Sequence, residues 1–303
     1  MRTLILFSLT LFTLTACRAQ NMITKVPPSD GPAKYPEKFN IIGGIEVPAG
    51  DPKYDSVLKI LTDGANCSAT LVGPKAILTA AHCAKNDATS TFTVGGKQYS
   101  AKMTRSTLYP GVDHDLALGL VSEIVPNVAY EQITAQELKA TDAIVMYGYG
   151  CIKAGGGGGN DGILRYGPST ISSFSAKDFV AKKPDGAALC FGDSGGPSFA
   201  SDGTQIGVAS KGNISDTSYF ANLTIPDSKS FLTKWAADNA VDICGVTMDC
   251  SGPAPEKIVV ASEKLGELQF TLNPETLDPA YVKRHMEMLI DFLETGVAPN
   301  YCF

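Results

Sequence analysis

Residues 192–197 read Gly-Asp-Ser-Gly-Gly-Pro, a glycine-rich turn around a single serine. Three short stretches precede it in a fixed order: Ile41-Ile42-Gly43-Gly44, Thr79-Ala80-Ala81-His82-Cys83 and Asp113-His114-Asp115-Leu116-Ala117-Leu118. A serine hydroxyl is a poor nucleophile at neutral pH and needs a base within hydrogen-bond reach. An imidazole, with a pKa near ~6.5, suits that task when a carboxylate orients it. Together the stretches offer Ser194, His82 and the carboxylates at Asp113 and Asp115 as candidates for one catalytic set.

The rest of the chain has ordinary globular composition. It has 303 residues, of which 44% are hydrophobic and 18% charged, which is ample for a core in one or two domains. The net charge of −6 provides no basic surface and therefore no electrostatic case for nucleic-acid binding.

Residues 1–17 have the pattern of an export signal: a short positive start at Arg2, an apolar run over 4–14, and small residues before Cys17. Leu14-Thr15-Ala16-Cys17 also resembles a bacterial lipoprotein cleavage box, in which Cys17 would carry a lipid anchor. An ordinary signal with a chance cysteine is the alternative. No later segment is long and apolar enough to span a bilayer, so we expect an exported protein, either secreted, periplasmic or lipid-anchored.

Residues 18–40 contain four prolines and few apolar residues, and we interpret them as a linker or pro-segment. From Ile41 onward, short apolar-alternating runs are separated by Gly, Pro, Asn and Asp, which is typical of an all-β barrel or sandwich. We expect strands at 56–61, 68–72, 91–94, 143–147, 205–210 and 219–223. A helix is expected at 227–238, where Phe231, Leu232 and Trp235 share one face. The glycine run 155–159 predicts a loop.

A Pro-rich stretch around 252–255 opens a C-terminal extension, 245–303. Two strand-like runs at 257–261 and 267–272 and a helical pattern at 279–294 predict a small α+β unit. A separate binding activity is one hypothesis for it, and a cap that stabilises the preceding domain is the other.

The four stretches, in this order and spacing, resemble those of the chymotrypsin/trypsin family of serine proteases over about residues 41–240. That resemblance implies two packed antiparallel six-stranded β-barrels followed by a C-terminal helix, with the active site between the barrels. It implies a protease domain at 41–244 that acts on protein or peptide substrates without metal or cofactor. It also implies the family mechanism, in which Ser194 attacks, His82 is the base and Asp115 orients the imidazole. The N–H groups of Gly192 and Ser194 would form the oxyanion hole.

Several alternatives compete with this assignment. Asp113 and His114 flank Asp115, but the apolar alternation after Asp115 favours it as the residue that precedes a barrel strand. Cys67, His82 and Cys83 could hold zinc, although a fourth ligand at suitable spacing is missing. A catalytically silent, protease-like binding protein is the alternative from another functional class.

The resemblance also implies a zymogen. Cleavage before Ile41 would free an α-amino group that pairs with Asp193 and orders the oxyanion loop. The alternative is that Asp193 only braces the loop. The residue before Ile41 is Asn40 rather than Arg or Lys, so we expect another protease to activate the chain.

Eight cysteines in an exported chain predict disulfides. The resemblance pairs Cys67 with Cys83. Cys190 usually pairs with a cysteine on a later loop, but no cysteine lies between 191 and 243, so Cys151 is the expected substitute. In the extension we pair Cys250 with Cys302.

The resemblance places the base of the P1 pocket at Ala188 and Leu189, where no aspartate is present to bind a substrate Arg or Lys. Ser210, Lys211 and Gly212 would form one wall, and Thr217 or Ser218 the other. We expect an apolar or small P1 residue, and Lys211 could favour an acidic substrate residue nearby.

Overall fold

The computed structural model describes residues 41–48, 50–134, 136–158, 161–182, 186–250, 256–262 and 266–272. The predicted signal segment with Cys17, the pro-segment 18–40, the helix at 279–294 and Cys302 lie outside these residues. Among the helices in the described part of the chain, none combines the length and apolarity that crossing a membrane requires.

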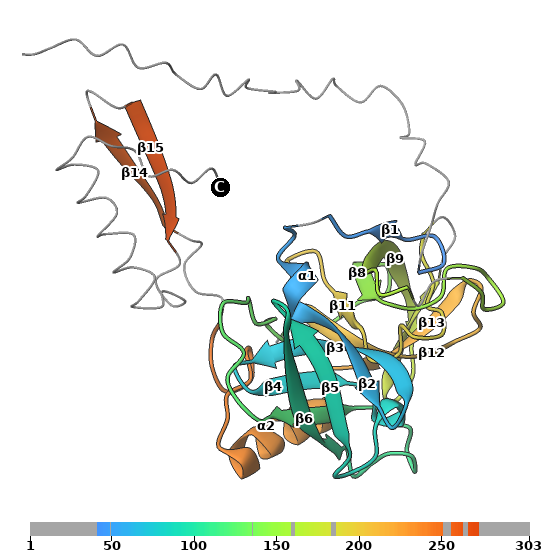
Figure 1. Ribbon diagram of the computed structural model, residues 1–303. Helices are drawn as coiled ribbons and strands as arrows, with labels where there is room; N and C mark the ends of the chain where they lie inside the picture. The colour runs from blue at the N-terminus through green and yellow to red at the C-terminus, as the bar shows by residue number, and fades with distance from the viewer. Residues whose placement is uncertain are drawn as a thin grey trace, which may run out of the picture. The chain divides into compact units, whose positions relative to one another are not determined.

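The first half of the described chain forms a closed barrel of six antiparallel strands, ordered β2-β3-β4-β7-β6-β5 (Figure 1). The strands are β2 (Val57–Thr62), β3 (Ala65–Gly73), β4 (Ala76–Thr79), β5 (Thr89–Val94), β6 (Lys97–Arg105) and β7 (Ala117–Val121). The short helices α1 (Lys53–Ser56) and η1 (Ala81–Cys83) precede β2 and follow β4. In β5, every second residue is buried, which is the period that a strand with one face toward a core requires.

The second half forms another antiparallel sheet, ordered β1-β9-β10-β13-β12-β11-β8. Its strands are β1 (Ile45–Glu46), β8 (Ala143–Gly148), β9 (Arg165–Phe174), β10 (Asp178–Lys182), β11 (Pro197–Phe199), β12 (Gln205–Gly212) and β13 (Thr217–Asn222). Because β8 also pairs with β9, six of these strands close on themselves and β1 joins from outside. The predicted pair of six-stranded barrels is therefore confirmed.

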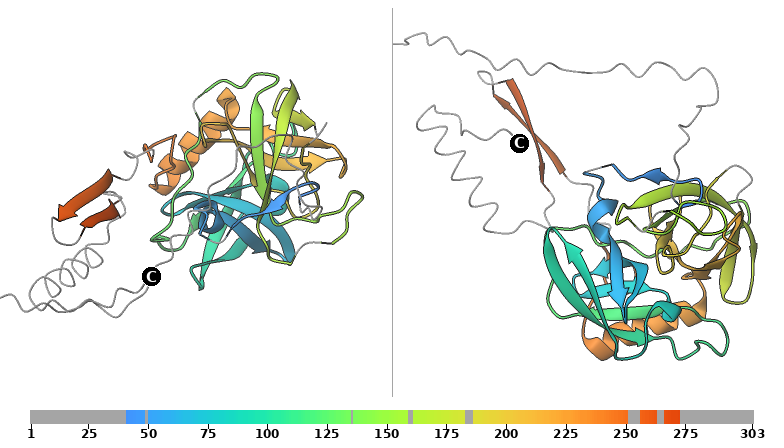
Figure 2. Two further views of the ribbon diagram at one scale, coloured as in Figure 1. Left: turned by 90° about the horizontal axis from the view of Figure 1, so that it is seen from above. Right: turned by 45° about the vertical axis from the view of Figure 1, so that its right-hand side comes forward.

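The helix α2 (Pro226–Asn239) follows the second barrel but packs on the first (Figure 2). It begins with Pro226, whose missing N–H costs nothing at a first helical position, and ends where Ala240 takes a left-handed φ of 51°. Leu232, Trp235 and Ala236 belong to the same buried cluster as the first barrel's core. The helix predicted at 227–238 is thus confirmed to within a residue at each end.

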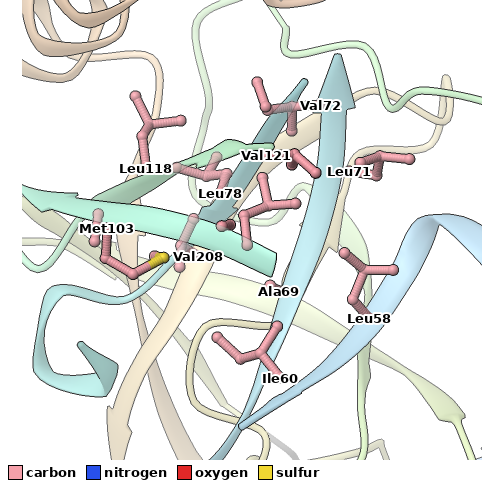
Figure 3. Packing of buried hydrophobic residues seen from close by; sticks show 14 of the residues in the cluster. Leu58, Ile60, Ala69, Leu71, Val72, Leu78, Met103, Leu118, Val121 and Val208 are labelled. Carbon is pink, nitrogen blue, oxygen red and sulfur yellow. The ribbon is translucent and has the colours of Figure 1, made fainter. Parts of the chain in front are cut away.

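The core of the first barrel is filled by aliphatic side chains from β2, β3, β4, β6 and β7 (Figure 3). Val208 of β12 joins this cluster, so apolar packing is continuous between the two barrels. Burial of apolar surface is favourable, so this contact contributes to holding the two barrels together. In the extension, β14 (Glu256–Ser262) pairs in antiparallel register with β15 (Gly266–Leu272), as the two strand-like runs predicted.

Candidate active site

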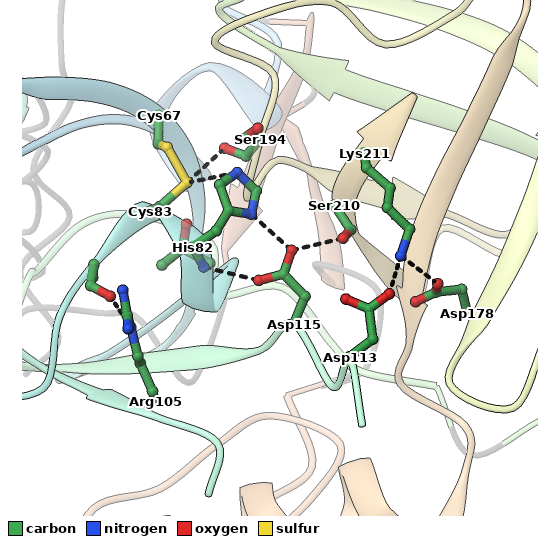
Figure 4. Close-up of polar contacts among 12 residues, drawn as sticks. Cys67, His82, Cys83, Arg105, Asp113, Asp115, Asp178, Ser194, Ser210 and Lys211 are labelled. Atoms are coloured by element: carbon green, nitrogen blue, oxygen red, sulfur yellow. Dashed lines mark hydrogen bonds and ion pairs between the residues drawn. A yellow bond between two sulfur atoms is a disulfide. The ribbon is translucent and has the colours of Figure 1, made fainter. Parts of the chain in front are cut away.

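His82 lies in η1, directly after β4, where the chain leaves the first barrel. A disulfide joins Cys83 to Cys67 of β3, with a Cα–Cα distance of 6.2 Å, as predicted. The backbone N–H of His82 donates to Asp115 Oδ1 at 2.8 Å, and His82 Nδ1 lies 2.7 Å from Asp115 Oδ2 (Figure 4). The same carboxylate therefore fixes both the backbone and the ring of His82.

Asp115 lies two residues before the start of β7, and its side chain is 3% exposed. Ser210 of β12 donates its hydroxyl proton to Asp115 Oδ2 at 2.6 Å. Burial would raise the pKa of Asp115, but the hydrogen bonds and charge of His82, together with the Ser210 bond, outweigh burial and lower that pKa below its usual range. Asp115 is thus held as a carboxylate that can stabilise an imidazolium.

The neighbours of Asp115 have different surroundings. His114 is fully buried between Ser106 Oγ, at 2.6 Å from Nδ1, and Ser228 Oγ, at 2.9 Å from Nε2. Burial and the charge of Lys177 lower its pKa to about 4, so this ring is neutral at physiological pH. Asp113 pairs with Lys211 at the surface. Among the described residues, neither side chain forms a hydrogen bond or ion pair with His82, so the choice of Asp115 fits the geometry.

Ser194 lies in a turn at residues 190–196, called the Ser194 turn below. Gly192 and Gly195 have φ values of 98° and 83°, which L side chains rarely adopt. A Cβ on Gly195 would also lie 1.9 Å from Thr79 Oγ1. These two glycines of the 192–197 motif are therefore required by the backbone and by close packing.

The turn brings Ser194 to the Cys83 side of the His82 ring (Figure 4). Cys83 Sγ lies 3.8 Å from His82 Nε2 and 3.6 Å from the Ser194 carbonyl oxygen, both as van der Waals contacts because the disulfide sulfur has no hydrogen to donate. Within the described residues, no hydrogen bond joins the Ser194 hydroxyl to Nε2. Such bonds are often long before substrate binds.

Asp193 points the other way, into the second barrel, and is fully buried. Its carboxylate accepts the N–H groups of Gly150 and Cys190, each at 2.8 Å. A Cβ on Gly148 or Gly150 would lie 2.2 Å and 2.5 Å from atoms of this carboxyl group, which explains the glycines at 148 and 150. Burial, only partly offset by the two backbone bonds and by Arg165, raises the pKa of Asp193 to about 7.

Ile41 is also fully buried, and Ile42 pairs with Ala188 through two 2.9 Å backbone hydrogen bonds. The start of the described chain is thereby fastened two residues from Cys190, whose N–H holds Asp193. In this chain the Ile41 nitrogen is in a peptide bond with Asn40, so the predicted ion pair with Asp193 stays a prediction.

Cys190 is bonded to Cys151, with a Cα–Cα distance of 5.2 Å, as predicted. This bridge joins the segment that carries Gly150 to the Ser194 turn. The glycine-rich loop that follows Cys151 lies against the turn, since a Cβ on Gly156 would come within 2.8 Å of the Phe191 ring. The same loop also contacts the segment after β12, where the Gly155 N–H donates to Ile214 O at 2.9 Å.

Some of the predicted P1 pocket residues contact one another in the second barrel. Ala188, Leu189 and Ser218 are all nearly inaccessible, and the Leu189 N–H donates to Ser218 Oγ at 2.9 Å. This bond favours Ser218, one of the two alternatives, as the residue opposite Leu189. Thr217 lies one position earlier in β13 and Gly212 pairs with Ser218 at the end of β12.

Lys211 is partly exposed, and its ammonium group contacts both Asp113 and Asp178, the latter at 3.5 Å. One positive charge therefore faces two carboxyl groups. This arrangement does not support the expectation that Lys211 favours an acidic substrate residue.

Cys67, His82 and Cys83 are also close enough together to suggest a metal site. The two sulfurs form a disulfide, however, so they are not thiolates that could bind zinc.

The predicted pairing of Cys250 with Cys302 is wrong. Cys250 is bonded to Cys244, at a Cα–Cα distance of 5.2 Å. Residues 243–248 form a tight turn in which Gly245 has a φ of 79°, so the chain reverses and brings together cysteines six positions apart.

Two polar residues at the site were not anticipated in these roles. Ser210 was expected only as a pocket wall, but its hydroxyl donates a hydrogen bond to Asp115. Ser68, one residue after Cys67, donates hydrogen bonds to the carbonyl oxygens of both Gly192 and Ser194. No local pattern distinguishes either serine, because each acts on residues far away in the sequence.

Comparison with known proteins agrees with this geometry. The sequence matches the Trypsin family over residues 41–226, so the chain belongs to the trypsin family of serine proteases. Similar solved structures include human heparin binding protein, at 15% identity and a TM-score of 0.53, and a double mutant of human heparin binding protein (CAP37), at 15% identity and a TM-score of 0.54. Each match covers 65% of this chain and 97% of that chain. No curated protein sequence matches this chain.

At this identity the structural likeness shows the fold alone. The family match supports a protease kind of enzyme whose substrates are proteins or peptides. The three disulfides among the described residues indicate an extracellular or exported protein.

Proposed function

We propose that this protein is a serine endopeptidase with Ser194 as nucleophile, His82 as general base and Asp115 as the residue that orients and stabilises His82. The observation that carries the proposal is the pair of hydrogen bonds between His82 and Asp115. One runs from the His82 backbone N–H at 2.8 Å, and the other joins His82 Nδ1 to the carboxylate at 2.7 Å. With Nδ1–H directed at Asp115, Nε2 is the nitrogen left to accept a proton on the Ser194 side.

In this mechanism, Ser194 Oγ attacks the scissile carbonyl carbon while its proton passes to His82 Nε2. The carbonyl oxygen becomes an oxyanion. Collapse of the tetrahedral intermediate breaks the C–N bond, and His82 gives the proton to the leaving amine. Water, activated by the same imidazole, then hydrolyses the acyl-enzyme and restores the Ser194 hydroxyl.

The N–H groups of Gly192 and Ser194 are the proposed oxyanion donors. Neither is used in a hydrogen bond within the described part of the chain, whereas the surrounding groups of the turn are. Asp193 N–H donates to Cys190 O at 3.2 Å, and Gly196 N–H donates to Asp193 O at 2.8 Å. Two free donors beside the nucleophile can stabilise developing negative charge without first breaking other bonds.

The proposed P1 preference is for apolar or small residues rather than Arg or Lys. Ala188, Leu189 and Ser218 supply no charge to neutralise a buried cation, and burying an unpaired charge costs several kcal/mol. A library of peptides digested by the processed protein, read by mass spectrometry, tests this preference. Preferred cleavage after Arg or Lys would overturn it.

Activation is proposed to follow cleavage before Ile41. The buried Asp193 has no cationic partner within hydrogen-bond distance among the described residues, and burial raises its pKa to about 7. A new Ile41 ammonium group would supply the missing charge. The activating enzyme would be another protease, since Asn40 does not suit cleavage after Arg or Lys.

The proposed organisation is a signal at 1–17, a pro-segment at 18–40, the protease domain at 41–244 and the extension at 245–303, which we propose stabilises that domain. If Cys17 is lipidated, as in a bacterial lipoprotein, residues 18–40 tether the domain over at most about 75 Å. No cysteine lies between 18 and 40, so cleavage before Ile41 would release the protease from the membrane. Active enzyme that begins at Ile41 yet remains lipid-anchored would contradict this coupling.

A fluorophosphonate probe tests the central proposal, because it reacts covalently with an activated serine. We expect the processed protein to be labelled on Ser194, and the Ser194→Ala variant not to be labelled. Absence of labelling in the processed, folded protein would favour the alternative, a silent binding protein. A heparin-binding role like that named for the similar structures finds no support in the net charge of −6.

A further inference from the structure

We infer that Ser68 is a positioning residue that holds the Ser194 turn in the conformation that binds the oxyanion. The inference rests on the proposed function and adds to it a specific residue from the other barrel. Ser68 lies in β3, next to Cys67, and is fully buried. It therefore acts through the turn and does not touch the substrate.

All the polar groups of Ser68 are engaged. Its N–H donates to Ser194 O at 2.8 Å, and its hydroxyl donates to Gly192 O at 2.9 Å. The same hydroxyl accepts the Tyr149 N–H at 3.1 Å, and the Ser68 carbonyl accepts the Thr79 hydroxyl at 2.7 Å. One residue of the first barrel thus fixes two carbonyl groups of the Ser194 turn. It also holds Tyr149, the residue that follows the end of β8.

The fixed carbonyls determine where the neighbouring N–H groups point, because each peptide unit is planar. Phe191 O accepts the Cys151 N–H at 2.8 Å and Asp193 O accepts the Gly196 N–H at 2.8 Å, which orients the peptides that carry the N–H groups of Gly192 and Ser194. The peptide between them, Gly192–Asp193, has its carbonyl held by the Ser68 hydroxyl. Without that bond, this middle peptide would keep only the 3.2 Å bond from Asp193 N–H to Cys190 O.

Gly192 makes this peptide the weakest point of the turn. Its φ of 98° lies in a region that glycine alone visits freely, so rotation about its backbone bonds is cheap. Rotation there would move the Gly192 N–H away from the position shared with the Ser194 N–H. A hydroxyl from the opposite barrel therefore supplies the restraint that glycine lacks.

The test is the Ser68→Ala variant, cleaved before Ile41 as the wild type is, with active sites counted by the burst of acyl-enzyme. We expect kcat per active site to fall roughly 10- to 100-fold, since a misplacement of about 1 Å has such effects. KM should change by less than about twofold, because the loss falls on the transition state. The affinity for a peptide aldehyde, whose adduct occupies the oxyanion hole, should weaken by the same factor as kcat/KM.

Ser198→Ala is the matched control. Ser198 is a fully buried serine in β11 whose hydroxyl has no hydrogen-bond partner among the described residues, so its removal should leave kcat per site unchanged. If Ser68→Ala does not fold, Ser68→Cys, which retains size and a weak donor, replaces it, and an intermediate loss of kcat is expected.

The inference is overturned if Ser68→Ala, or Ser68→Cys in its place, has fewer active sites but a wild-type kcat and aldehyde affinity per site, because that result indicates a purely structural role. Failure of the wild type itself to form an acyl-enzyme would instead refute the proposed function. The two failures are therefore distinguishable in the same experiment.

Discussion

The first barrel presents His82 and Asp115 through side-chain hydrogen bonds, whereas the second barrel presents Ser194 through a backbone turn. The first arrangement depends on groups that are fixed by the folded barrel and by the Cys67–Cys83 bridge. The second depends on a fully buried carboxyl group, Asp193, and on a bond from Ser68 across the interface. We therefore expect the two halves to respond differently to mutation, processing and pH.

The largest effect is expected for the first barrel. Asp115→Asn keeps the size of the side chain but removes the charge that stabilises the imidazolium, so kcat should fall roughly 10⁴-fold at neutral pH. Steady-state kinetics on a cleaved peptide substrate measures this. A loss of less than tenfold would show that the His82–Asp115 pair is not catalytic.

Proteolytic processing is expected to have the next largest effect, on the second barrel. The kcat of the chain cut before Ile41 should be roughly 10²- to 10³-fold higher than that of the intact chain, which is the range associated with an oxyanion donor. The reason is that Asp193 gains an ion-pair partner, which orders the Ser194 turn. Asp193→Asn provides the control, since it should remove most of the gain. Equal activity of cut and intact chains would mean that Asp193 only braces the loop.

The disulfides distinguish the Ser194 turn from the rest of the fold. Replacing both Cys151 and Cys190 by Ser should cost about 2–4 kcal/mol of unfolding free energy, measured in urea, and should also lower kcat several-fold. The matched control replaces Cys244 and Cys250, whose loop spans only six residues, and should lose less stability with kcat unchanged. Equal kinetic effects of the two pairs would remove the special link to the turn.

The smallest effect concerns pH. In the intact chain, burial raises the pKa of Asp193 from 3.8 to about 7. The folded state therefore binds more protons than the unfolded state between these values, and stability from this group falls as pH rises from about 4 to about 7.

Thermal melts followed by fluorescence of Trp235, the single tryptophan, should show this fall in the intact chain relative to Asp193→Asn. The cut chain should show less of it, because the Ile41 ammonium group favours the charged carboxylate. Identical pH dependence of intact wild type and Asp193→Asn would contradict the assignment.

Individual strands and the helix followed from local patterns, whereas the pair of six-stranded barrels was expected from the family resemblance. The alternation in β5 and β8 and the apolar face of α2 predicted these elements because each has one face toward a core. β9 is harder to predict, because Gly167 and Pro168 lie inside it and both residues argue against a strand. Pairing with β8, β10 and β1 overrides that local preference.

The candidate site divides in the same way. His82, Asp115 and Ser194, the proposed catalytic residues, lie in short stretches that resemble those of the trypsin family, so they could be proposed from the sequence. Ser68 could not, because its bond to Gly192 joins positions 124 residues apart. The wrong pairing of Cys250 has a related cause, since cysteine spacing alone does not show that residues 243–248 reverse direction.

The position of α2 has a consequence for how the chain acquires its structure during synthesis. Leu232 and Trp235 come late in the chain, yet they complete the core of the barrel that is made first. That barrel cannot bury its apolar surface fully until residue 236 has left the ribosome. The two barrels are therefore expected to reach their final packing together, so that a nascent or truncated chain displays His82 and Asp115 on an unfinished scaffold and has no proteolytic activity of its own.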